Sequence, residues 1–324
     1  MSNNKVFIPP FKIQGIKTKL VPLIKSNIEI DKNTTWIEPF MGSAVVGLNV
    51  ANHNAIFADL NPHIINFYNQ LKNRTITAVI VREFLEEEGA LLSEKGGDYY
   101  YFIRDRFNKE HDPLDFLFLN RSCFNGMIRF NKNNSFNVPY GHKPQRFAKA
   151  YVTKIVNQVK HFESKLRENN WIFLCQSFEK TIEMADKNSF IYCDPPYIGR
   201  HIDYFDSWNE DQEKQLQQSL SLSGSRFMLS SWDYNQYRVN PYISSIWSGC
   251  QKITKEHFYF VGARETNRSS VTEALLTNYP IINKVVDVAT VSSMKQLAFD
   301  FASTTNNETL SDVSENYNDS RCVL

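Results

Sequence analysis

Two patterns of apolar residues alternate along the chain. Short apolar runs bounded by turn-forming residues are typical of buried strands, whereas apolar residues three or four positions apart are typical of helices. The runs that predict strands lie in 34–44 (before a glycine turn), 55–59, 171–174, 190–193, 226–230, 253–260 and 273–277. Helical spacing lies in 16–25, 45–50, 62–71, 79–92, 99–107, 114–119, 149–168 and 210–222. Because strands and helices alternate, we expect an α/β fold.

Composition narrows the class of protein. A length of 324 residues predicts two domains, or one domain with a large insertion, and 42% hydrophobic residues suffice for a sizeable core. Five cysteines without a C-x-x-C pair indicate reduced thiols and no zinc site. Nothing resembles a signal peptide or a membrane span. We therefore expect a cytoplasmic protein without a membrane partner, whose polar residues 302–324 form a disordered tail.

The net charge of +1 hides an uneven distribution of charge. No Asp or Glu occurs between Asp115 and Glu163, and such an acid-free stretch argues for a surface that faces a polyanion. Aromatic residues are interleaved with its cations, namely Phe124, Phe130, Phe136 and Tyr140. The cations are Arg121, Arg129, Lys132, Lys143, Arg146, Lys149, Lys154 and Lys160.

A β-hairpin is predicted inside this stretch. Apolar segments 127–130 and 136–138 flank the turn-forming residues 131–135. A basic hairpin with projecting aromatics suits a DNA groove, where it can wedge a base step. The alternative is an ordinary hairpin with a solvated face.

The most informative stretch is Asp194-Pro195-Pro196-Tyr197, which follows the apolar run 190–193. Prolines cannot donate to a sheet ladder, so the strand must end at Asp194. A carboxylate, a carbonyl and a ring are then held at the carboxyl end of a central strand, where open α/β sheets bind ligands. This set suits a planar group that carries an amine. The alternative is a turn that merely ends a strand.

A second group of residues is typical of a nucleotide-like ligand. The turn at Gly42 follows the first strand, although only Gly42 and Gly47 are glycines and the pattern is not G-x-G-x-x-G. Asp59 ends the next strand and fits a ribose contact, or alternatively a helix N-cap. Gly15 and Lys17 fit a carboxylate or phosphate, although Lys17 could equally lie on the solvated face of a short helix that carries Lys17, Lys19 and Lys25.

Together these motifs resemble the Dam-like, α-group DNA adenine-N6 methyltransferases over nearly the whole chain apart from the tail. In order they are Pro-Pro-Phe-Lys with Gly15-x-Lys17, Glu-Pro-Phe-Met-Gly42, Asp59, Arg121-x-x-Phe-Asn-Gly-x-x-Arg-Phe-Asn131, Phe136-Asn-Val-Pro-Tyr-Gly141 and Asp194-Pro-Pro-Tyr197.

The resemblance implies a fold and a domain plan. The fold is a Rossmann-like, class I S-adenosylmethionine-dependent methyltransferase sheet with an inserted, mainly helical target-recognition domain that bears a β-hairpin. Residues 1–72 and 169–290 would form the catalytic domain, which binds S-adenosyl-L-methionine. Residues 73–168 would form the target-recognition, DNA-binding domain.

The implied function is that of a site-specific DNA adenine-N6 methyltransferase of a restriction-modification system. It would flip an adenine out of double-stranded DNA and methylate it, with GATATC as the site and its first adenine as the target. One alternative is a methyltransferase that acts on RNA, on a protein amide or on a different DNA site such as GATC. Two further alternatives are a DNA-binding protein with a decayed catalytic domain and a nicotinamide-dependent dehydrogenase. We further expect a monomer, associated with the bacterial nucleoid and paired in function with a restriction endonuclease.

Site residues follow from the resemblance, and none of them is a metal ligand. The chain departs from the family pattern at two positions. Ala44 stands where the family often has a glycine, so its methyl would lie near the cofactor. Ser177 stands where the family often has an acid. Asp194, Pro195, Pro196 and Tyr197 are the expected catalytic residues; Phe11, Gly15, Lys17, Glu38, Pro39, Phe40, Gly42, Asp59, Ser177, Phe178 and Asp194 are expected to bind the cofactor; and Arg121, Phe124, Asn125, Met127, Arg129, Asn131, Lys132, Asn137, Tyr140, Lys143, Arg264 and Arg268 are expected to contact DNA.

Overall fold

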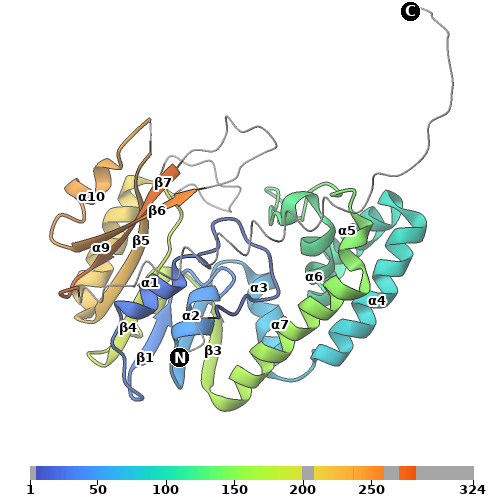
Figure 1. Cartoon of the computed structure of the whole chain (residues 1–324), viewed down its shortest axis with the longest axis horizontal. Helices are drawn as coiled ribbons and strands as arrows, with labels where there is room; N and C mark the ends of the chain where they lie inside the picture. The colour runs from blue at the N-terminus through green and yellow to red at the C-terminus, as the bar shows by residue number, and fades with distance from the viewer. Residues whose placement is uncertain (1–4, 199–207, 236, 259–269, 282–324) are drawn as a thin grey trace, which may run out of the picture. The chain divides into compact units, whose positions relative to one another are not determined.

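A seven-stranded sheet with helices on both faces organises the chain (Figure 1). The computed structural model describes residues 5–198, 208–235, 237–258 and 270–281, so Arg264, Arg268 and the tail 302–324 lie outside the described residues. The expected α/β fold is confirmed. The strands are β1 Thr35–Glu38, β2 Asn54–Asp59, β3 Asn170–Cys175, β4 Ser189–Cys193, β5 Arg226–Asn235, β6 Gln251–Phe258 and β7 Ser270–Thr277.

In the strand order, β3-β2-β1-β4-β5-β7-β6, the direction in which successive strands are added to the sheet reverses at β1. From β1 the chain builds outward through β2 and β3, and it then returns to add β4 on the other side of β1. β1 to β5 are parallel neighbours, whereas β7 runs antiparallel between β5 and β6. Such a reversal opens a crevice at the carboxyl ends of the two central strands.

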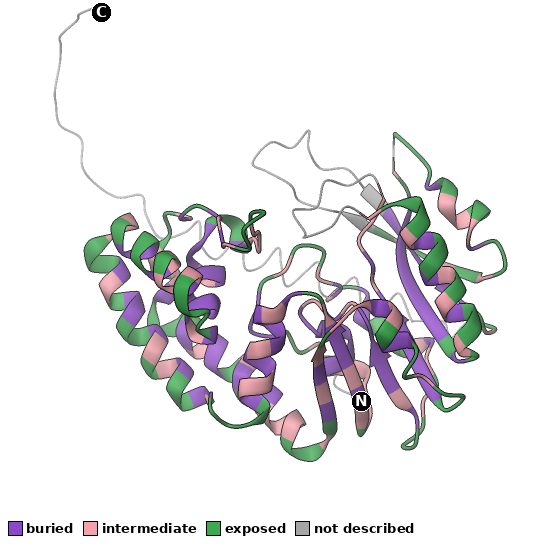
Figure 2. Ribbon diagram, turned by 180° about the vertical axis from the view of Figure 1, so that it is seen from behind, coloured by how far each residue is buried: buried purple, intermediate pink, exposed green. Residues whose placement is uncertain are grey.

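Residues of the central strands alternate between two hydrophobic cores, as expected for strands buried on both faces. Trp36, Phe190 and Tyr192 lie in the core on one face, under α1 Val21–Ser26, α2 Val45–Val50 and α3 Pro62–Lys72. Ile37 and Ile191 lie in the other core, with residues of α8 Phe178–Ile182 and α9 Glu210–Ser223. Figure 2 shows the central strands buried along most of their length.

Four helices are inserted between α3 and β3. They are α4 Ala78–Lys95, α5 Gly97–Glu110, α6 Pro113–Ser122 and α7 Lys149–Glu168, and in Figure 1 they lie beside the β3 end of the sheet. The predicted helical segments are confirmed, and α7 has the predicted bounds. Their apolar faces join the first core through Phe162 of α7, which stacks on Tyr68 of α3 at 4.5 Å. Within the described part of the chain, no helix is both long and apolar enough to cross a membrane.

The predicted β-hairpin is only partly correct. Its arms meet in a single isolated bridge between Phe130 and Phe136, and no strand is formed there. The Asn131 side chain helps to close the turn, because its Oδ1 accepts from the backbone N–H groups of Asn133 at 2.9 Å and Ser135 at 3.0 Å. The arms are also joined by two backbone bonds, from the N–H of Asn131 to the carbonyl of Ser135 at 2.9 Å and from the N–H of Asn137 to the carbonyl of Arg129 at 3.2 Å. The side-chain bonds therefore add to a short ladder.

Of the four aromatics expected to project from this region, two are buried and one, Phe130, is half-buried. Phe136 and Tyr140 are 1% and 5% exposed, and Tyr140 stacks on Tyr100 at 5.2 Å. Phe130 stacks on His63 of α3 at 5.0 Å. Phe124 is the most exposed of the four rings, at 50%. The prediction was therefore wrong for Phe136 and Tyr140, because each is buried against an aromatic partner within the fold.

The first helix also starts later than expected. α1 begins at Val21, so Lys17 and Lys19 precede it and only Lys25 lies on the helix. Proline at position 22 is compatible with this start, because its missing N–H falls in the first turn. Lys17 is thereby removed from the helix surface and is only 6% exposed.

Helix α2 approaches the sheet closely at Gly47. A Cβ atom added there would lie 2.2 Å from Phe57 Cε1 of β2 and 2.5 Å from Glu38 Oε2 of β1. Only a residue without a side chain fits this position, and the close approach brings the start of α2 over the end of β1.

We therefore predict that Gly47→Ala lowers the free energy of unfolding by ~1–3 kcal/mol, the usual cost of overpacking a core. Urea titration followed by circular dichroism measures this change. Gly249→Ala is the matched control, because an added Cβ there meets nothing within 4 Å. Equal stabilities of the two variants would contradict the close approach.

Candidate active site

A cavity of about 530 Å³ opens where the central parallel strands end. A separate hollow near Asp31 and Arg226 lies at the opposite, amino ends of the strands. Among the described residues, the cavity is lined from four directions: the segment before α1, the loops after β1 and β2, the loops after β3 and β4, and the start of α9. Its walls include Ile13, Gly15, Lys17, Glu38, Pro39, Phe40, Gly42, Asp59, Asn61, Ser177, Phe178, Asp194, Pro195, Pro196, Tyr197, Trp208 and Gln212.

Glu38 ends β1 and is buried, with 2% exposed. Its Oε2 accepts from Trp36 Nε1 at 3.0 Å and from the backbone N–H of Gly47 at 3.0 Å. Burial raises the pKa of Glu38 to about 8; the two hydrogen bonds lower it, and nearby Asp194 and Asp59 raise it further. Glu38 is thus a carboxyl group that changes charge near neutral pH.

Asp59 ends β2 and ties two loops together. Its Oδ2 accepts from the N–H of Gly42 at 2.8 Å, and its Oδ1 accepts from the N–H of Asn61 at 2.8 Å. Burial raises the pKa of Asp59, and these backbone bonds oppose the rise. Asn61, not Asp59, is the N-cap of α3, accepting from His63 and Ile64. The alternative that Asp59 itself caps the helix is therefore wrong.

Asp194 follows β4 and forms an ion pair with Lys17, whose Nζ lies 2.8 Å from Asp194 Oδ1. The same Nζ donates to the carbonyl of Gly15 at 3.0 Å and lies 5.2 Å from the centre of the Tyr197 ring. Burial raises the pKa of Asp194, and Lys17 opposes this rise. Burial would lower the pKa of Lys17, but Asp194, Tyr197 and Glu273 raise it well above its usual value. Asp194 keeps 24% of its side chain exposed, so the pair borders the cavity.

Three aromatic rings form one wall of the cavity. Phe40 stacks on Phe178 at 5.4 Å, and Trp208 meets both rings edge-on at 5.5 and 5.6 Å. Trp208 is held by a 2.6 Å hydrogen bond from its Nε1 to Glu213. An apolar wall of this kind favours a flat, weakly hydrated ring.

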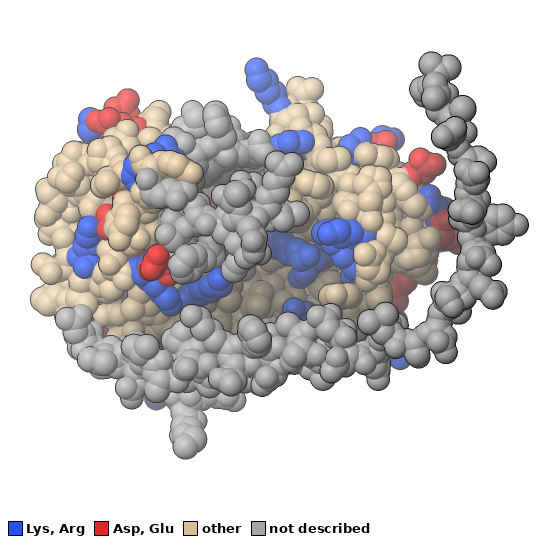
Figure 3. Space-filling view, turned by 45° about the horizontal axis from the view of Figure 1, so that its top comes forward, with Lys and Arg blue, Asp and Glu red and all other residues tan. Residues whose placement is uncertain are grey.

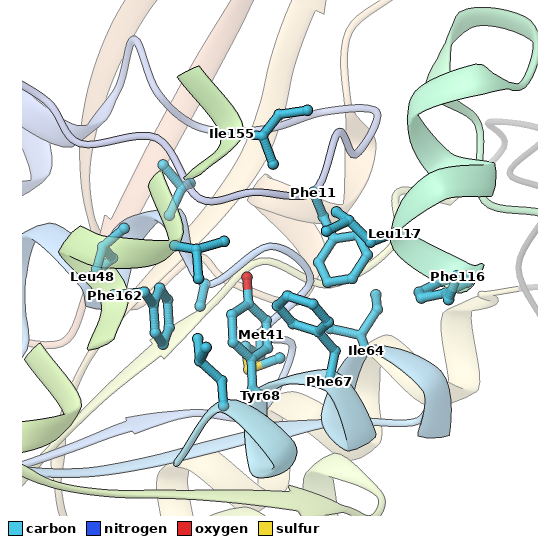
Figure 4. Close-up of a cluster of buried hydrophobic side chains, with 14 of the residues drawn as sticks. Phe11, Met41, Leu48, Ile64, Phe67, Tyr68, Phe116, Leu117, Ile155 and Phe162 are labelled. Carbon is cyan, nitrogen blue, oxygen red and sulfur yellow. The ribbon is translucent and has the colours of Figure 1, made fainter. Parts of the chain in front are cut away.

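The structure brings together all of the predicted catalytic residues and all but one of the predicted cofactor residues. Phe11 is the exception: its ring packs in the core, 4.8 Å from Phe67 and 5.2 Å from Phe116 (Figure 4). Ala44 also packs in the core, 0% exposed, in a left-handed conformation with φ 61°, which costs an L-residue about 1–2 kcal/mol. Its methyl therefore does not lie along the cavity as expected. Ser177 lies at the N-cap of α8 and lines the cavity.

The predicted DNA contacts divide by exposure. Phe124, Asn125, Lys132 and Lys143 are exposed, as is Asn131, whereas Met127, Arg129 and Asn137 are half-buried. Arg129 donates from its Nε to Asn137 Oδ1 at 2.8 Å.

Arg121 and Tyr140 do not suit the DNA contacts predicted for them. The Arg121 guanidinium donates to the carbonyl of Pro10 and to Gln158, and burial lowers the pKa of Arg121 to about 10. Tyr140 is buried beneath Tyr100. Both side chains hold the fold together, so neither is presented to a partner.

Several residues that shape the cavity were missed from the sequence. Trp36 and Gly47 hold Glu38, while Trp208 and Gln212 line the cavity from the start of α9. A tryptophan two positions before the acid lies on the same side of a strand, and this spacing is the one signal that could have revealed the first contact.

Cations gather in a hollow on the face that carries the cavity (Figure 3). Burial lowers the pKa of Lys12 to about 8, and nearby Arg121, Arg146 and Lys154 lower it further. The Arg146 guanidinium is fixed by the carbonyls of Arg121 at 3.2 Å and Cys123 at 2.8 Å. An anion shared by Lys12, Arg146 and Lys154 would offset the repulsion among these three cations. No cluster of three or more His, Cys, Asp or Glu side chains that could hold a metal occurs among the residues that the structure describes.

Comparison with known proteins agrees with this site. A model of the D12 class N6 adenine-specific DNA methyltransferases matches residues 14–261. The chain is 37% identical over 197 residues to a DNA adenine methylase of Haemophilus influenzae, covering 58% of this chain and 63% of that protein. It is 36% identical over 202 residues to the DNA adenine methylase of Escherichia coli K12, covering 61% and 66%. It is 31% identical over 293 residues to the type II methyltransferase M.FokI of Planomicrobium okeanokoites, covering 85% of this chain but only 43% of that protein.

The raised pKa of Glu38 predicts a pH-dependent stability. The folded state holds this proton up to about pH 8, whereas the unfolded chain loses it near 4.5. The contribution to stability is therefore complete below about pH 4.5 and is lost as the pH rises to about 8. Glu38→Gln should remove this dependence. Between pH 5 and pH 8, its free energy of unfolding should rise by roughly 3 kcal/mol relative to that of the parent chain.

Urea titrations of both chains at pH 5 and pH 8, without added ligand, measure this difference. Glu88→Gln is a control, since Glu88 is a buried acid among the inserted helices, paired with Arg106 at 2.9 Å. A stability gap between Glu38→Gln and the parent that stays constant with pH would contradict the assignment.

Proposed function

The chain belongs to the D12 class N6 adenine-specific DNA methyltransferases, and on this basis we propose that it transfers a methyl group from S-adenosylmethionine to the N6 amine of an adenine in double-stranded DNA. The observation that carries the proposal is the Asp194 carboxylate, set beside Pro195 and Tyr197 at the edge of a cavity between β1 and β4. The match covers only part of each curated relative: 63% of the length of the Haemophilus influenzae protein and 43% of the length of M.FokI.

The cavity has the donor and acceptor set that S-adenosylmethionine requires. Asp59 offers a carboxylate for the ribose hydroxyls, and Phe40 with Phe178 forms an apolar wall for the adenine ring. Glu38 supplies a buried carboxyl group that could face the ammonium or the sulfonium. Ser177 would accept from the adenine amine of the cofactor. When bound, the cofactor supplies an electrophilic methyl group on a positively charged sulfur, which is a good leaving group.

The target adenine would occupy the part of the cavity beside Asp194. Tyr197 would stack on the base, while the Asp194 carboxylate and the Pro195 carbonyl accept from the N6 amine. These bonds draw the amine away from planarity and free its lone pair for reaction. Because the proline ring fixes φ of Pro195, the turn is rigid and the acceptors need little reorganisation.

Lys17 has two possible partners in this scheme. It neutralises Asp194 in the structure, and the carboxylate of the amino-acid part of S-adenosylmethionine would compete for the same ammonium. A Lys17 ammonium shared between the two carboxylates would still keep Asp194 ionised, while leaving one of its oxygens a stronger acceptor for the target amine. Cofactor binding and activation of Asp194 are then one event.

Residues 73–168 are proposed as the target-recognition domain, and residues 1–72 with 169–290 as the catalytic domain. The exposed turn Phe124–Gly126 would enter the gap left by the flipped adenine, with Asn125 in a left-handed conformation at φ 53°. Flipping costs a few kcal/mol, which stacking and hydrogen bonds in the pocket must offset. Arg129 would read the guanine of a G-A step, and the cations around Lys12 and Arg146 would face the phosphates.

The exact site is proposed from a finer similarity, to the EcoRV modification methylase, carried by residues 117–130 and 192–200. It suggests GATATC, methylated on its first adenine, and a restriction-modification role in the bacterial cytoplasm with a partner endonuclease. The type II relative is compatible with such a role. We propose that the chain acts as a monomer, because a palindromic site does not require a dimer.

We predict that Asp194→Ala abolishes methyl transfer, with a fall of at least ~10³-fold, because the amine loses its charged acceptor. Cofactor affinity, measured by calorimetry, should change much less. Asp59→Asn should give the opposite result, with weaker cofactor binding and a smaller loss of rate at saturating cofactor.

Asp233→Asn is the matched control, since Asp233 is also a mostly buried carboxylate paired with a lysine, Lys252, at 3.0 Å. Its rate should stay within a few-fold of the parent. An Asp194→Ala chain with the parent rate would overturn the catalytic assignment.

A second prediction concerns the substrate. With radiolabelled S-adenosylmethionine, a short duplex that carries GATATC should be methylated, and the same duplex with its first adenine already methylated on both strands should not. Label in a duplex that carries only GATC would indicate a looser site. No label in any duplex, with cofactor binding intact, would argue for another site or for RNA.

A further inference from the structure

The segment before α1 connects the turn at 124–126 with the ion pair at Asp194. Residues 10–12 lie against the end of α6, and Ile13 to Lys17 then run along the cavity. We call residues 10–17 the strap. One end of the strap is held by α6, and the other ends at the Lys17–Asp194 pair.

Asn120 holds the first end. It lies in the last turn of α6 and is 0% exposed. Its Oδ1 accepts from the N–H of Lys12 at 2.8 Å, and its Nδ2 donates to the carbonyl of Lys12 at 2.8 Å. A neighbouring strand would make this same pair of bonds, so one side chain fixes both the position and the orientation of the strap.

The same side chain also holds the turn proposed to enter DNA. Asn120 Nδ2 donates to the carbonyl of Gly126 at 3.2 Å. Gly126 is in close contact with the strap, because a Cβ added there would lie 2.9 Å from both Cβ and Cδ of Lys12. Arg121 adds a bond from its guanidinium to Pro10. The turn and the strap therefore share one buried anchor and have no space between them.

The far end of the strap sets the place of the ammonium. Gly15 has φ 77°, a turn that an L-residue rarely adopts, and its carbonyl accepts from Lys17 Nζ at 3.0 Å. The carbonyl of Lys17 then accepts from the N–H groups of Leu20 and Val21, at 2.8 and 3.1 Å. Only residues 13–16 separate these two fixed points, so a displacement of Lys12 is passed along a short segment to Gly15 and Lys17.

We propose that Asn120 is a positioning residue of the reaction, which couples the turn Phe124–Gly126 to the catalytic carboxylate by fixing the strap that places Lys17 on Asp194. The proposal rests on the proposed function for the role of the turn and of Asp194. Asn120 contacts neither substrate nor cofactor and acts through the strap. A correctly seated turn then aligns the site, and a displaced turn misaligns it.

The test compares Asn120→Asp with a matched control, Asn108→Asp. Asn108 makes the same pair of backbone bonds, to Phe136 at 2.7 and 3.2 Å, in the same inserted region, but it has no contact with the strap. Both substitutions keep the shape and the acceptor while removing the donors. Asn120→Ala is added so that the result does not depend on a new charge.

Hydrogen exchange provides a readout that needs no activity. In Asn120→Asp and Asn120→Ala, exchange should rise in peptides that cover 10–17 and 124–127, whereas in Asn108→Asp it should rise only around 136. A short GATATC duplex should slow exchange of 10–17 in the parent and not in the Asn120 variants. If the strap exchanges alike in parent and Asn120 variants, the coupling is overturned.

Single-turnover methyl transfer at saturating duplex and cofactor tests the consequence for the reaction. We expect a fall of about tenfold or more in the Asn120 variants and less than about twofold in Asn108→Asp, since small misplacements of reacting groups are costly. The acid limb of the rate profile should move to higher pH in the Asn120 variants only, because Lys17 then holds the Asp194 carboxylate less well.

Equal losses of rate in the Asn120 and Asn108 variants, or an unshifted acid limb, would reduce Asn120 to a structural role and overturn the proposal. A parent chain that methylates no duplex would overturn the proposed function instead. In that case the effect of DNA on exchange of the strap still decides whether the turn and the strap are coupled.

Discussion

Three carboxyl groups, of Glu38, Asp59 and Asp194, are crowded at the edge where β1, β2 and β4 end. Burial raises the pKa of each group, and a buried carboxylate is stable only where hydrogen-bond donors or a positive charge face it. Gly42 and Gly47 supply backbone N–H groups, and Lys17 supplies a charge. The glycine turn, the start of α2 and the course of the strap are all arranged around this need. The cavity is the space that these loops enclose.

The elements were largely predictable from the sequence, because their burial follows a regular period. Helix α7 has one apolar stripe and the predicted bounds, and β4 is an apolar run closed by prolines. The motif residues after β1, β2 and β4 could be placed for a different reason: parallel strands that share a reversal point bring their carboxyl ends together. Local patterns and topology agreed at this edge, so the cavity could be predicted without knowledge of its distances.

The errors fall where the sequence pattern carries no information on partners. Phe11, Phe136 and Tyr140 look like any aromatic residue of a binding surface, yet each is buried against rings from distant segments. Arg121 lies in a stretch of cations, yet its guanidinium donates to the carbonyl of Pro10 and to Gln158. Whether such a side chain is exposed depends on contacts between segments far apart in the chain, and a single sequence does not report those. The contacts of Asn120 were invisible for the same reason.

The position of β4 beside β1 has a consequence for how the protein is made. Glu38 and Asp194 become neighbours only after the chain has produced both α3 and the four inserted helices, and has then closed the long loop between β1 and β4. The inserted helices pack on one another within residues 78–168, whereas β1 pairs with β4 across a loop that contains all of them, and parallel pairing across such a long loop is slow. During synthesis, the helical region can therefore be compact while the edge of the sheet that will carry the carboxyl groups is still open. Assembly of the cavity is a late event, and a nascent chain stalled before β4 would display helices without a reaction centre.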